Sequence, residues 1–498
     1  MSHEREVKMI VADSFELPDL HDAVVGAVVG DVEEREISDV YYDTIDLRLA
    51  RWGCTLRQRA GEGWTVKIPR PTKGIVLDRE EVVFRGDPGD PPVAALKLVS
   101  SLTRGVDVDV VARLRTRRLV RSWRTDGGTV ITELTDDDVR ASDIDGHEVR
   151  FREIEFELAP DVEGHVVDEV VTRLTAANKS AERPIPKLVR ALGASALEPP
   201  DVDVAALPSE PTAHQVIQSA IASSVARLLL QLPAARLGTD PEGVHQARVA
   251  ARRLRSDLKT FEPLLDSEWS VDLQERLRWL IDELGAVRDN DVLRSKLSDL
   301  IARQPEIDDE AARGVFHQVR LEHRRERRRL LRHLDDDRAT ELLDHLVAAS
   351  AAPATVERAG RPASGVMPKL VRKRWKRLDR AIGGFGHPPT AAELHKVRIL
   401  AKRLRYATEA VAPAAGKQAW KFAKDAASIQ DALGELNDAT VIGAWLAATA
   451  DRLDGPAAFA AGQLSQQLAI DGRTNERQWR SAHRSLKRRT AWFSGAVD

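Results

Sequence analysis

Residues 149–158 read VRFREIEFEL, and this stretch decides the fold of the first part of the chain. Its charged and apolar side chains alternate, so in a β-strand the three glutamates share one face and the apolar residues between them share the other. The glutamates are Glu153, Glu155 and Glu157. Buried carboxylates are costly unless they are paired, and an apolar face must be covered. We therefore expect a sheet with a wet, charged face and a covered apolar face.

The same alternation recurs upstream. Segments rich in Val, Ile and Thr, separated by Gly, Asp and Pro, predict strands over residues 3–10, 54–60, 64–69, 77–84, 112–122, 128–134 and 149–158. One polar face is ordinary in an antiparallel sheet. Here several strands each carry both basic and acidic residues on the same face. This pattern favours a sheet closed into a barrel, with the charged residues around a wet interior and helices packed outside.

The charged residues on these faces indicate the chemistry. Carboxylates are hard oxygen ligands suited to Mg²⁺ or Mn²⁺, and no thiolate or histidine cluster favours zinc. Guanidinium groups match phosphate oxygens. The candidate metal ligands are Glu4, Glu6, Glu133, Asp137, Glu153 and Glu155. The candidate phosphate-binding residues are Lys8, Arg57, Arg59, Lys67, Arg79, Arg115 and Arg117. Together they predict a polyphosphate site.

These residues also form an ordered set of motifs. EREVK at 4–8 is followed by YYDT at 41–44, LRQR at 56–59, WTVK at 64–67, DREE at 78–81, TEL at 132–134, EIE at 153–155 and NKS at 178–180. The set resembles CYTH domains, the triphosphate tunnel metalloenzymes, over residues 3–195. The resemblance implies an α+β domain with an eight-stranded antiparallel barrel that hydrolyses or cyclises a triphosphate with a divalent metal. It also implies that Glu4, Glu6 and Lys8 are catalytic and that Lys179 binds triphosphate.

Composition divides the chain in two. The 498 residues include 75 Lys+Arg, 78 Asp+Glu and one cysteine, which excludes a disulfide framework. Residues 1–200 contain 28 basic and 38 acidic residues, whereas the remainder contain 47 and 40. The proline-rich stretch 198–211 predicts a linker between a domain at 1–197 and an all-α domain at 212–498. The charged N-terminus lacks the pattern of a signal peptide, so we expect a cytoplasmic protein.

The all-α part contains an internal repeat. Residues 242–265 align without gaps to residues 392–415, and LGAVRDNDV at 284–292 matches LGELNDATV at 433–441. The copies, about 212–350 and 366–498, predict duplicated four-helix bundles.

Basic residues recur at the same helical spacing in both copies and form one narrow stripe on each helix. The stripes are His245, Arg248, Arg252, Arg255 and Lys259 in the first copy, and His395, Arg398, Lys402 and Arg405 in the second. A solvated face explains one such helix, but duplicated stripes favour a polyanion. Few aromatic residues accompany them, so nucleic acid is disfavoured. The repeat resembles the CHAD domain, the conserved-histidine α-helical domain, which implies binding of inorganic polyphosphate.

The sequence thus predicts a Mg²⁺- or Mn²⁺-dependent phosphohydrolase acting on inorganic triphosphate or short polyphosphate, with a helical module for longer chains and no membrane association. Two alternatives stay open at this point. One is an adenylate cyclase using ATP, for which Trp52, Trp64 or Trp123 would have to contribute a base pocket. The other is a polyphosphate-binding or targeting protein without catalysis.

Overall fold

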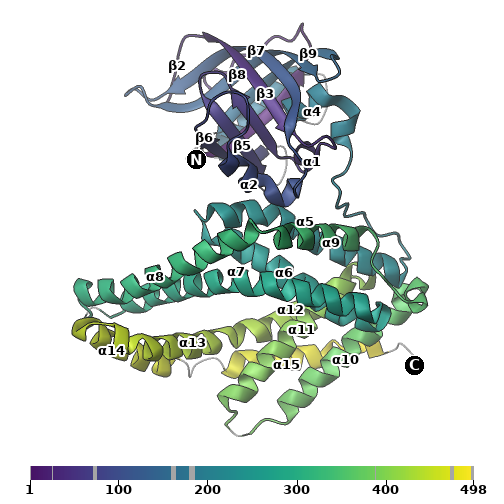
Figure 1. Ribbon diagram of the computed structural model, residues 1–498, viewed down its shortest axis with the longest axis vertical. Coiled ribbons are helices and arrows are strands. Elements are labelled where there is room, and N and C mark those ends of the chain that lie inside the picture. The colour runs from purple at the N-terminus through teal and green to yellow at the C-terminus, as the bar shows by residue number, and fades with distance from the viewer. Residues whose placement is uncertain are drawn as a thin grey trace. The chain divides into compact units, whose positions relative to one another are not determined.

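The computed structural model (Figure 1) describes residues 2–24, 26–70, 76–158, 164–178, 185–304, 306–386, 388–471 and 476–494. The chain forms two compact units, Met1–Asp201 and Val202–Asp498. The division falls inside the predicted linker. The start of that linker belongs to the first unit, because Trp52 Nε1 donates a hydrogen bond to Asp201 and Arg51 pairs with Glu198.

The first unit is a closed antiparallel barrel. The strand order β7-β3-β4-β5-β6-β1-β9-β8 returns to β7, so eight strands form a ring, and the two-residue β2 pairs with the end of β7. The strands are β1 (Ser2–Val11), β2 (Val28–Val29), β3 (Glu33–Asp43), β4 (Thr55–Arg59), β5 (Gly63–Pro69), β6 (Val76–Phe84), β7 (Asp109–Arg124), β8 (Val130–Asp143) and β9 (Glu148–Leu158). The helices are α1 (Arg48–Arg51), α2 (Val93–Thr103), α3 (Gly164–Ala177) and α4 (Lys187–Leu192). The predicted eight-stranded barrel is confirmed.

Strand β3 is the one strand of the eight-stranded ring that alternation did not predict. Its sequence, EEREISDVYYD, has an exposed and charged first half, so it lacks the apolar period of its neighbours. Its pairing with β7 over eleven residue pairs places it in the ring.

The outer face of the barrel is apolar where α3 covers it. Val7 of β1 and Phe156 of β9 pack in one buried cluster with Val170 and Leu174 of α3. These strand residues lie on the face opposite Lys8 and Glu155. The expectation of helices outside and charges inside therefore holds over this part of the barrel.

One end of the barrel interior is apolar. Leu114, Val139 and Phe151 lie on the same strand faces as Arg118, Asp137 and Glu153 respectively, because strand side chains alternate. They pack in a second buried cluster with Leu188 and Val189 of α4. This end of the interior is therefore filled, and α4 separates the apolar part from the charged part.

The second unit is helical throughout. Its helices are α5 (Ala213–Leu237), α6 (Pro241–Phe261), α7 (Ser267–Ile301), α8 (Asp309–Leu334), α9 (Asp337–Ala351), α10 (Ala363–Gly383), α11 (Ala391–Ala415), α12 (Lys417–Ala432), α13 (Gly434–Thr449), α14 (Gly455–Asp471), α15 (Glu476–Arg488) and α16 (Ala491–Ser494). The long helix α7 of the first copy corresponds to α12 and α13 of the second, because the helix is interrupted at Leu433 in the second copy.

The two copies meet where each begins. Ala213 N donates to Arg361 O at 2.9 Å, and Ala363 N donates to Pro211 O at 2.8 Å. The two donors are 150 residues apart in the sequence, as are the two acceptors, so these reciprocal bonds relate the two copies by an approximate two-fold axis.

The two copies also share a core, which is formed by helices from the middle of each copy. Leu297 of α7 and Val315 of α8 pack in one buried cluster with Leu446 of α13 and Leu464 of α14, and Figure 1 shows these four helices side by side. The duplicated helical architecture is confirmed, with this shared core in addition to the packing within each copy.

Helix α5 is long and apolar enough to cross a membrane by length and composition, and it is the one such helix among the described residues. Of its most apolar window, 56% is buried. The helix is capped by Thr212 and packs against α6 and α9.

Candidate functional sites

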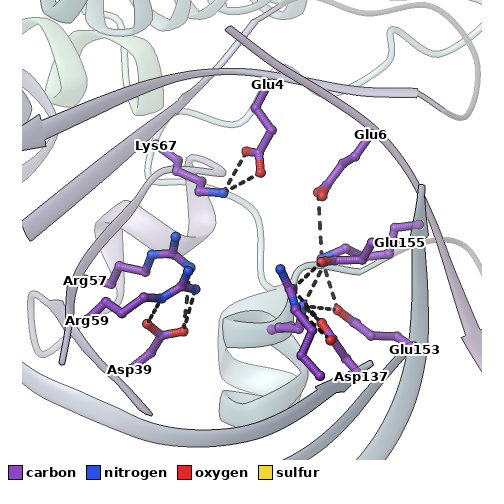
Figure 2. Close-up of polar contacts among 12 residues, drawn as sticks. Glu4, Glu6, Asp39, Arg57, Arg59, Lys67, Asp137, Glu153 and Glu155 are labelled. Carbon is purple, nitrogen blue, oxygen red and sulfur yellow. Dashed lines mark hydrogen bonds and ion pairs between the residues drawn. The ribbon is translucent and has the colours of Figure 1, made fainter. Parts of the chain in front are cut away.

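The charged part of the barrel interior forms a cavity of about 200 Å³. It is lined by Glu4, Glu6, Lys8, Tyr41, Thr55, Arg57, Arg59, Glu62, Lys67, Arg79, Glu81, Arg118, Glu155, Glu157, Pro186, Lys187 and Leu188. The predicted residues Glu4, Glu6, Lys8, Arg57, Arg59, Lys67, Arg79 and Glu155 are therefore brought together. Figure 2 shows Arg57, Arg59 and Lys67 on one side of this space, with Asp39 beside the arginines, and Glu6, Asp137, Glu153 and Glu155 on the other side.

Basic residues from β4, β5 and β6 form one wall. Lys67 Nζ bonds both carboxylate oxygens of Glu4, at 2.6 and 2.7 Å, and Arg59 Nε donates to Asp39 at 2.8 Å (Figure 2). Burial, together with repulsion from Arg57, lowers the pKa of Lys67. Four basic side chains, Arg57, Arg59, Lys67 and Arg79, thus line one cavity together with their carboxylate partners, and such a cluster of cations favours an anionic ligand.

A second charged cluster lies where α4 reaches the cavity. Lys187 Nζ lies 2.7 Å from Asp137, 2.7 Å from Glu153 and 2.9 Å from Glu155. Burial opposes its charge, but these carboxylates raise the pKa of Lys187 well above its usual value. Sequence reasoning missed this residue. Its one local signal is that it follows Pro186 at the first position of a short helix.

Strand register decides which carboxylates meet. In the β1–β9 pair, Lys8 lies opposite Glu155 and Glu6 lies opposite Glu157, whereas Glu153 lies opposite Ile10. Burial and repulsion from Glu4 and Glu6 raise the pKa of Glu157 to about 7. Glu157 therefore shares the cavity with the β1 glutamates in the place predicted for Glu153. No cation pairs with it among the described residues.

Several predicted site residues lie elsewhere. Arg115 and Arg117 are exposed on the outer face, where Arg117 donates to Glu34, and Arg118 lines the cavity in their place. Glu133 does not line the cavity and accepts a hydrogen bond from Ser122. Lys179 lies outside the described residues.

The acidic residues divide into two groups with respect to a metal ion. Carboxylate oxygens of Asp137, Glu153 and Glu155 lie within 4.8 Å of one another, but Lys187 occupies their centre. Glu4, Glu6 and Glu157 offer oxygen ligands at the cavity with an uncompensated carboxylate among them. Hard oxygen donors of this kind fit Mg²⁺ or Mn²⁺. Glu4, Glu6, Glu155 and Glu157 are therefore the candidate ligands of a divalent ion in the cavity, although their oxygens do not form one of the clusters within 4.8 Å of one another that the described residues contain.

The basic stripes of the second unit face each other. A groove of about 990 Å³ is lined by His245, Arg248, Arg252, His395, Arg398, Lys402 and Arg405. A smaller pocket of about 290 Å³ is lined by Arg252, Arg255, Lys259, Arg398 and Lys402. All nine predicted residues of the stripes thus line one of two adjoining spaces between α6 and α11. Arg374 of α10 and Arg403 of α11 line the smaller pocket and were not predicted.

Lys402 lies at the centre of this positive charge. Burial and repulsion from Arg252, Arg398 and Arg248 lower its pKa to about 7. Its ammonium nitrogen lies 5.5 Å from the centre of the Tyr406 ring. An amine held in this way regains its charge when an anion enters.

Carboxylates are also present in the groove. Asp289 accepts from Arg248 Nη1 at 2.8 Å and is 64% exposed. Arg253 pairs with both Asp257 and Glu409, and burial raises the pKa of Asp257 to about 7. The Asp289 side chain, paired with Arg248, is thus part of the groove lining.

Family comparison identifies both units. The family model of the CYTH domain matches residues 2–188, and that of the CHAD domain matches residues 219–447. The protein belongs to the family of chains that combine a CYTH domain with a CHAD domain. CYTH domains are metal-dependent and generally are enzymes that act on phosphates.

Among the relatives, the chain is 30% identical over 522 residues to "Uncharacterized protein Rv2226" of Mycobacterium tuberculosis (strain ATCC 25618 / H37Rv), covering 97% of this chain and 96% of that protein. Two solved structures are similar in part. The CHAD domain from the plant Ricinus communis shares 26% identity, with TM-score 0.47, over 57% of this chain and 96% of its own. PptA from Streptomyces chartreusis shares 21% identity, with TM-score 0.44, over 56% of this chain and 99% of its own.

Proposed function

We propose that this protein is a divalent-metal-dependent phosphohydrolase that acts on inorganic triphosphate or short polyphosphate in its barrel and binds longer polyphosphate in its helical groove. The observation that carries the proposal is the barrel cavity, where a basic wall faces a group of carboxylates within about 200 Å³. A metal site beside a phosphate site is the arrangement that phosphoanhydride hydrolysis requires.

The residues divide the work by charge. Arg57, Arg59, Lys67 and Arg79 line the basic wall and would bind the oxygens of the phosphate chain, stabilising the charge that develops during transfer. Glu4, Glu6, Glu155 and Glu157 would hold the divalent ion. When bound, such an ion neutralises phosphate charge and polarises an attacking water. Lys8, enclosed by Glu6, Glu153 and Glu155, keeps the carboxylates in position.

The lining of the cavity favours an inorganic substrate over ATP. Tyr41 is the aromatic residue in the described lining. Trp64 is buried on the outer side, where it packs against Tyr42 and donates to Asp87 O at 3.0 Å. A nucleoside base therefore has one aromatic ring to stack on in the described lining of the cavity, that of the buried Tyr41, which supports a phosphohydrolase over a cyclase.

The groove supports the second half of the proposal. Both stripes converge on it, and the lowered pKa of Lys402 records a cluster of like charges that an anion would stabilise. The described groove lining contains Tyr406 and Trp420 as aromatic residues, so phosphate rather than bases would supply most contacts.

The test is release of orthophosphate from inorganic triphosphate by the full-length protein with Mg²⁺ or Mn²⁺. The double variant Glu4→Gln/Glu6→Gln should lose at least about 100-fold in rate. Arg117→Gln is the matched control, because Arg117 lies on a barrel strand but outside the cavity, and it should keep the wild-type rate.

Three results would contradict the proposal. A folded double variant that still turns over triphosphate would exclude the carboxylates from catalysis. A wild-type protein that binds triphosphate and releases nothing would make the barrel a binding site, and formation of cyclic AMP from ATP would make it a cyclase.

A further inference from the structure

Helix α8 carries a second concentration of positive charge, away from the groove. Exposed residues of α8 between positions 311 and 334 are Arg313, His317, Arg320, Leu321, Arg324, Arg325, Arg328, Arg329 and Arg332. None is acidic, although Asp and Glu outnumber Lys and Arg in the chain, 78 to 75. At 1.5 Å per residue, the stretch from Arg313 to Arg332 is about 28 Å long. No α8 residue is part of the described lining of the groove or of the smaller pocket.

Packing accounts for two arginines of this helix but not for the others. Arg327, which is not exposed, donates to the backbone carbonyls of Ala235 and Leu237 and so caps α5, and Arg329 pairs with Glu283. Among the described residues, no carboxylate lies within ion-pair distance of Arg320, Arg324 or Arg328, which we call the α8 stripe. Of the two acidic residues of α8 after its first turn, Glu322 accepts from Trp445 Nε1 at 2.8 Å, and Glu326 pairs with Arg325 and Arg329 rather than with the stripe.

The α8 stripe by itself lowers the stability of the helix. Its members are spaced four residues apart, so each lies over the next, and like charges at this spacing destabilise a helix by a few tenths of a kcal/mol per pair. The helix is held instead by apolar residues on its other face, such as Val315, Val319 and Leu330, and by Asp308 at its N-cap.

The second copy shows that the fold does not need this charge. Helix α14, which packs against α8 and follows α13 in the second copy, contains no lysine or arginine over Gly455–Asp471. Both helices contribute to the same shared core, Val315 from α8 and Leu464 from α14. The comparison within one domain therefore separates the packing role, which both helices have, from the charge, which only α8 has.

We propose that the α8 stripe is a second polyphosphate-binding surface that engages long chains in addition to the groove. This inference rests on the proposed binding of polyphosphate by the groove. The occupant is a bare phosphate polymer because the exposed face contains arginines, one histidine and one leucine but no aromatic residue for stacking on a base. Guanidinium groups bind phosphate in pairs of hydrogen bonds, whereas lysine, absent from this helix, does not.

The consequence is a dependence on chain length. A triphosphate or a short chain occupies a single site, whereas a chain long enough to reach both the groove and the α8 stripe gains from the second surface through a high effective concentration. Replacing the three stripe arginines removes about three phosphate contacts. The slope of log affinity against log salt should then fall by about 2 for long chains.

The experiment measures binding of full-length protein to inorganic triphosphate and to long-chain polyphosphate. The stripe variant is Arg320→Glu/Arg324→Glu/Arg328→Glu. The control, Arg294→Glu/Arg358→Glu/Arg361→Glu, makes the same charge change at exposed arginines outside α8 and outside both spaces. We expect the stripe variant to lose at least about tenfold in long-chain affinity with triphosphate binding unchanged, and the control to lose much less.

Each contrary outcome has a distinct meaning. Equal long-chain affinity in the two variants, with thermal unfolding unchanged, overturns the second surface and leaves the groove intact as the binding site. If the stripe variant loses affinity for duplex DNA or for vesicles of anionic lipid, but not for long-chain polyphosphate, polyphosphate is overturned as the occupant of the stripe. If the variant Arg252→Gln/Arg398→Gln binds long-chain polyphosphate as tightly as the wild type, the proposed function of the groove itself is overturned, because both residues line the groove and the smaller pocket.

Discussion

Binding of polyphosphate should take up a proton at Lys402. In the free protein its pKa is about 7, because the side chain is buried and faces Arg248, Arg252, Arg398 and Arg405. At pH 8 it is then only about one-tenth charged. A bound polyanion stabilises the ammonium form and returns the pKa toward its ordinary value of about 10.4.

The magnitude follows from these two pKa values. Binding takes up about 0.9 proton at pH 8, about 0.5 at pH 7 and about 0.1 at pH 6 from this residue. Affinity should accordingly fall almost tenfold between pH 8 and pH 9 and change little from this source below pH 6. The sign is fixed because the bound state holds more protons than the free state.

Lys402→Arg provides the comparison, since a guanidinium stays charged throughout this range. Calorimetry at pH 8 in buffers of different ionisation enthalpy measures the proton uptake. His245 and His395 line the same groove in both proteins, so the difference between wild type and variant isolates Lys402. Equal uptake in the two proteins would refute the reasoning.

Three further predictions follow from the barrel and the groove. Arg118→Ala should lower kcat/KM for triphosphate by at least about tenfold while Arg117→Ala leaves it unchanged, because only Arg118 lines the cavity; equal effects in a phosphate-release assay would place the ligand elsewhere. Lys187→Met removes the cation that contacts all three buried carboxylates Asp137, Glu153 and Glu155 and leaves Lys8 and Arg118, which contact two each, so urea unfolding should show a loss of about 3–5 kcal/mol, and an unchanged midpoint would contradict it. Asp257 has a raised pKa of about 7, so the folded state holds a proton that the unfolded state releases near pH 4, and stability falls as pH rises toward 7. Between pH 5 and pH 8, the free energy of unfolding of Asp257→Asn, measured with urea, should therefore fall by about 2 kcal/mol less than that of the wild type. The same decrease in both proteins would argue against a role of Asp257.

Local alternation predicted much of the barrel domain. Side chains two residues apart share a strand face, so the alternation by itself placed Arg57, Arg59 and Lys67 on the charged side of the sheet, and all three line the cavity. In the helical domain, the 150-residue repeat and the spacing of its stripes predicted which residues line the groove. The alternation and the stripe spacing are local patterns, and each is complete within a single strand or helix.

The choice of face on β7 shows where alternation fails. The rule that charges lie inside and apolar residues outside selected Arg115 and Arg117, yet the interior near α4 is apolar and takes Leu114. Residues 114 and 118 share that inner face, so Arg118 enters the cavity and Arg117 faces out. The sequence of one strand does not say which end of a barrel is filled.

The sequence by itself therefore determined which residues share a strand or helix face, the duplication of the helical domain and the chemical character of both sites. Tertiary structure alone decided the partners across the barrel. The β1–β9 register set Glu6 beside Glu157, and the insertion of α4 brought Lys187 among carboxylates 32 to 50 residues away. The physical reason is that ring closure and helix packing are settled by the burial of apolar surface over the whole domain, such as Leu188 and Val189 beneath the cavity. The charged residues occupy the positions that this burial leaves them.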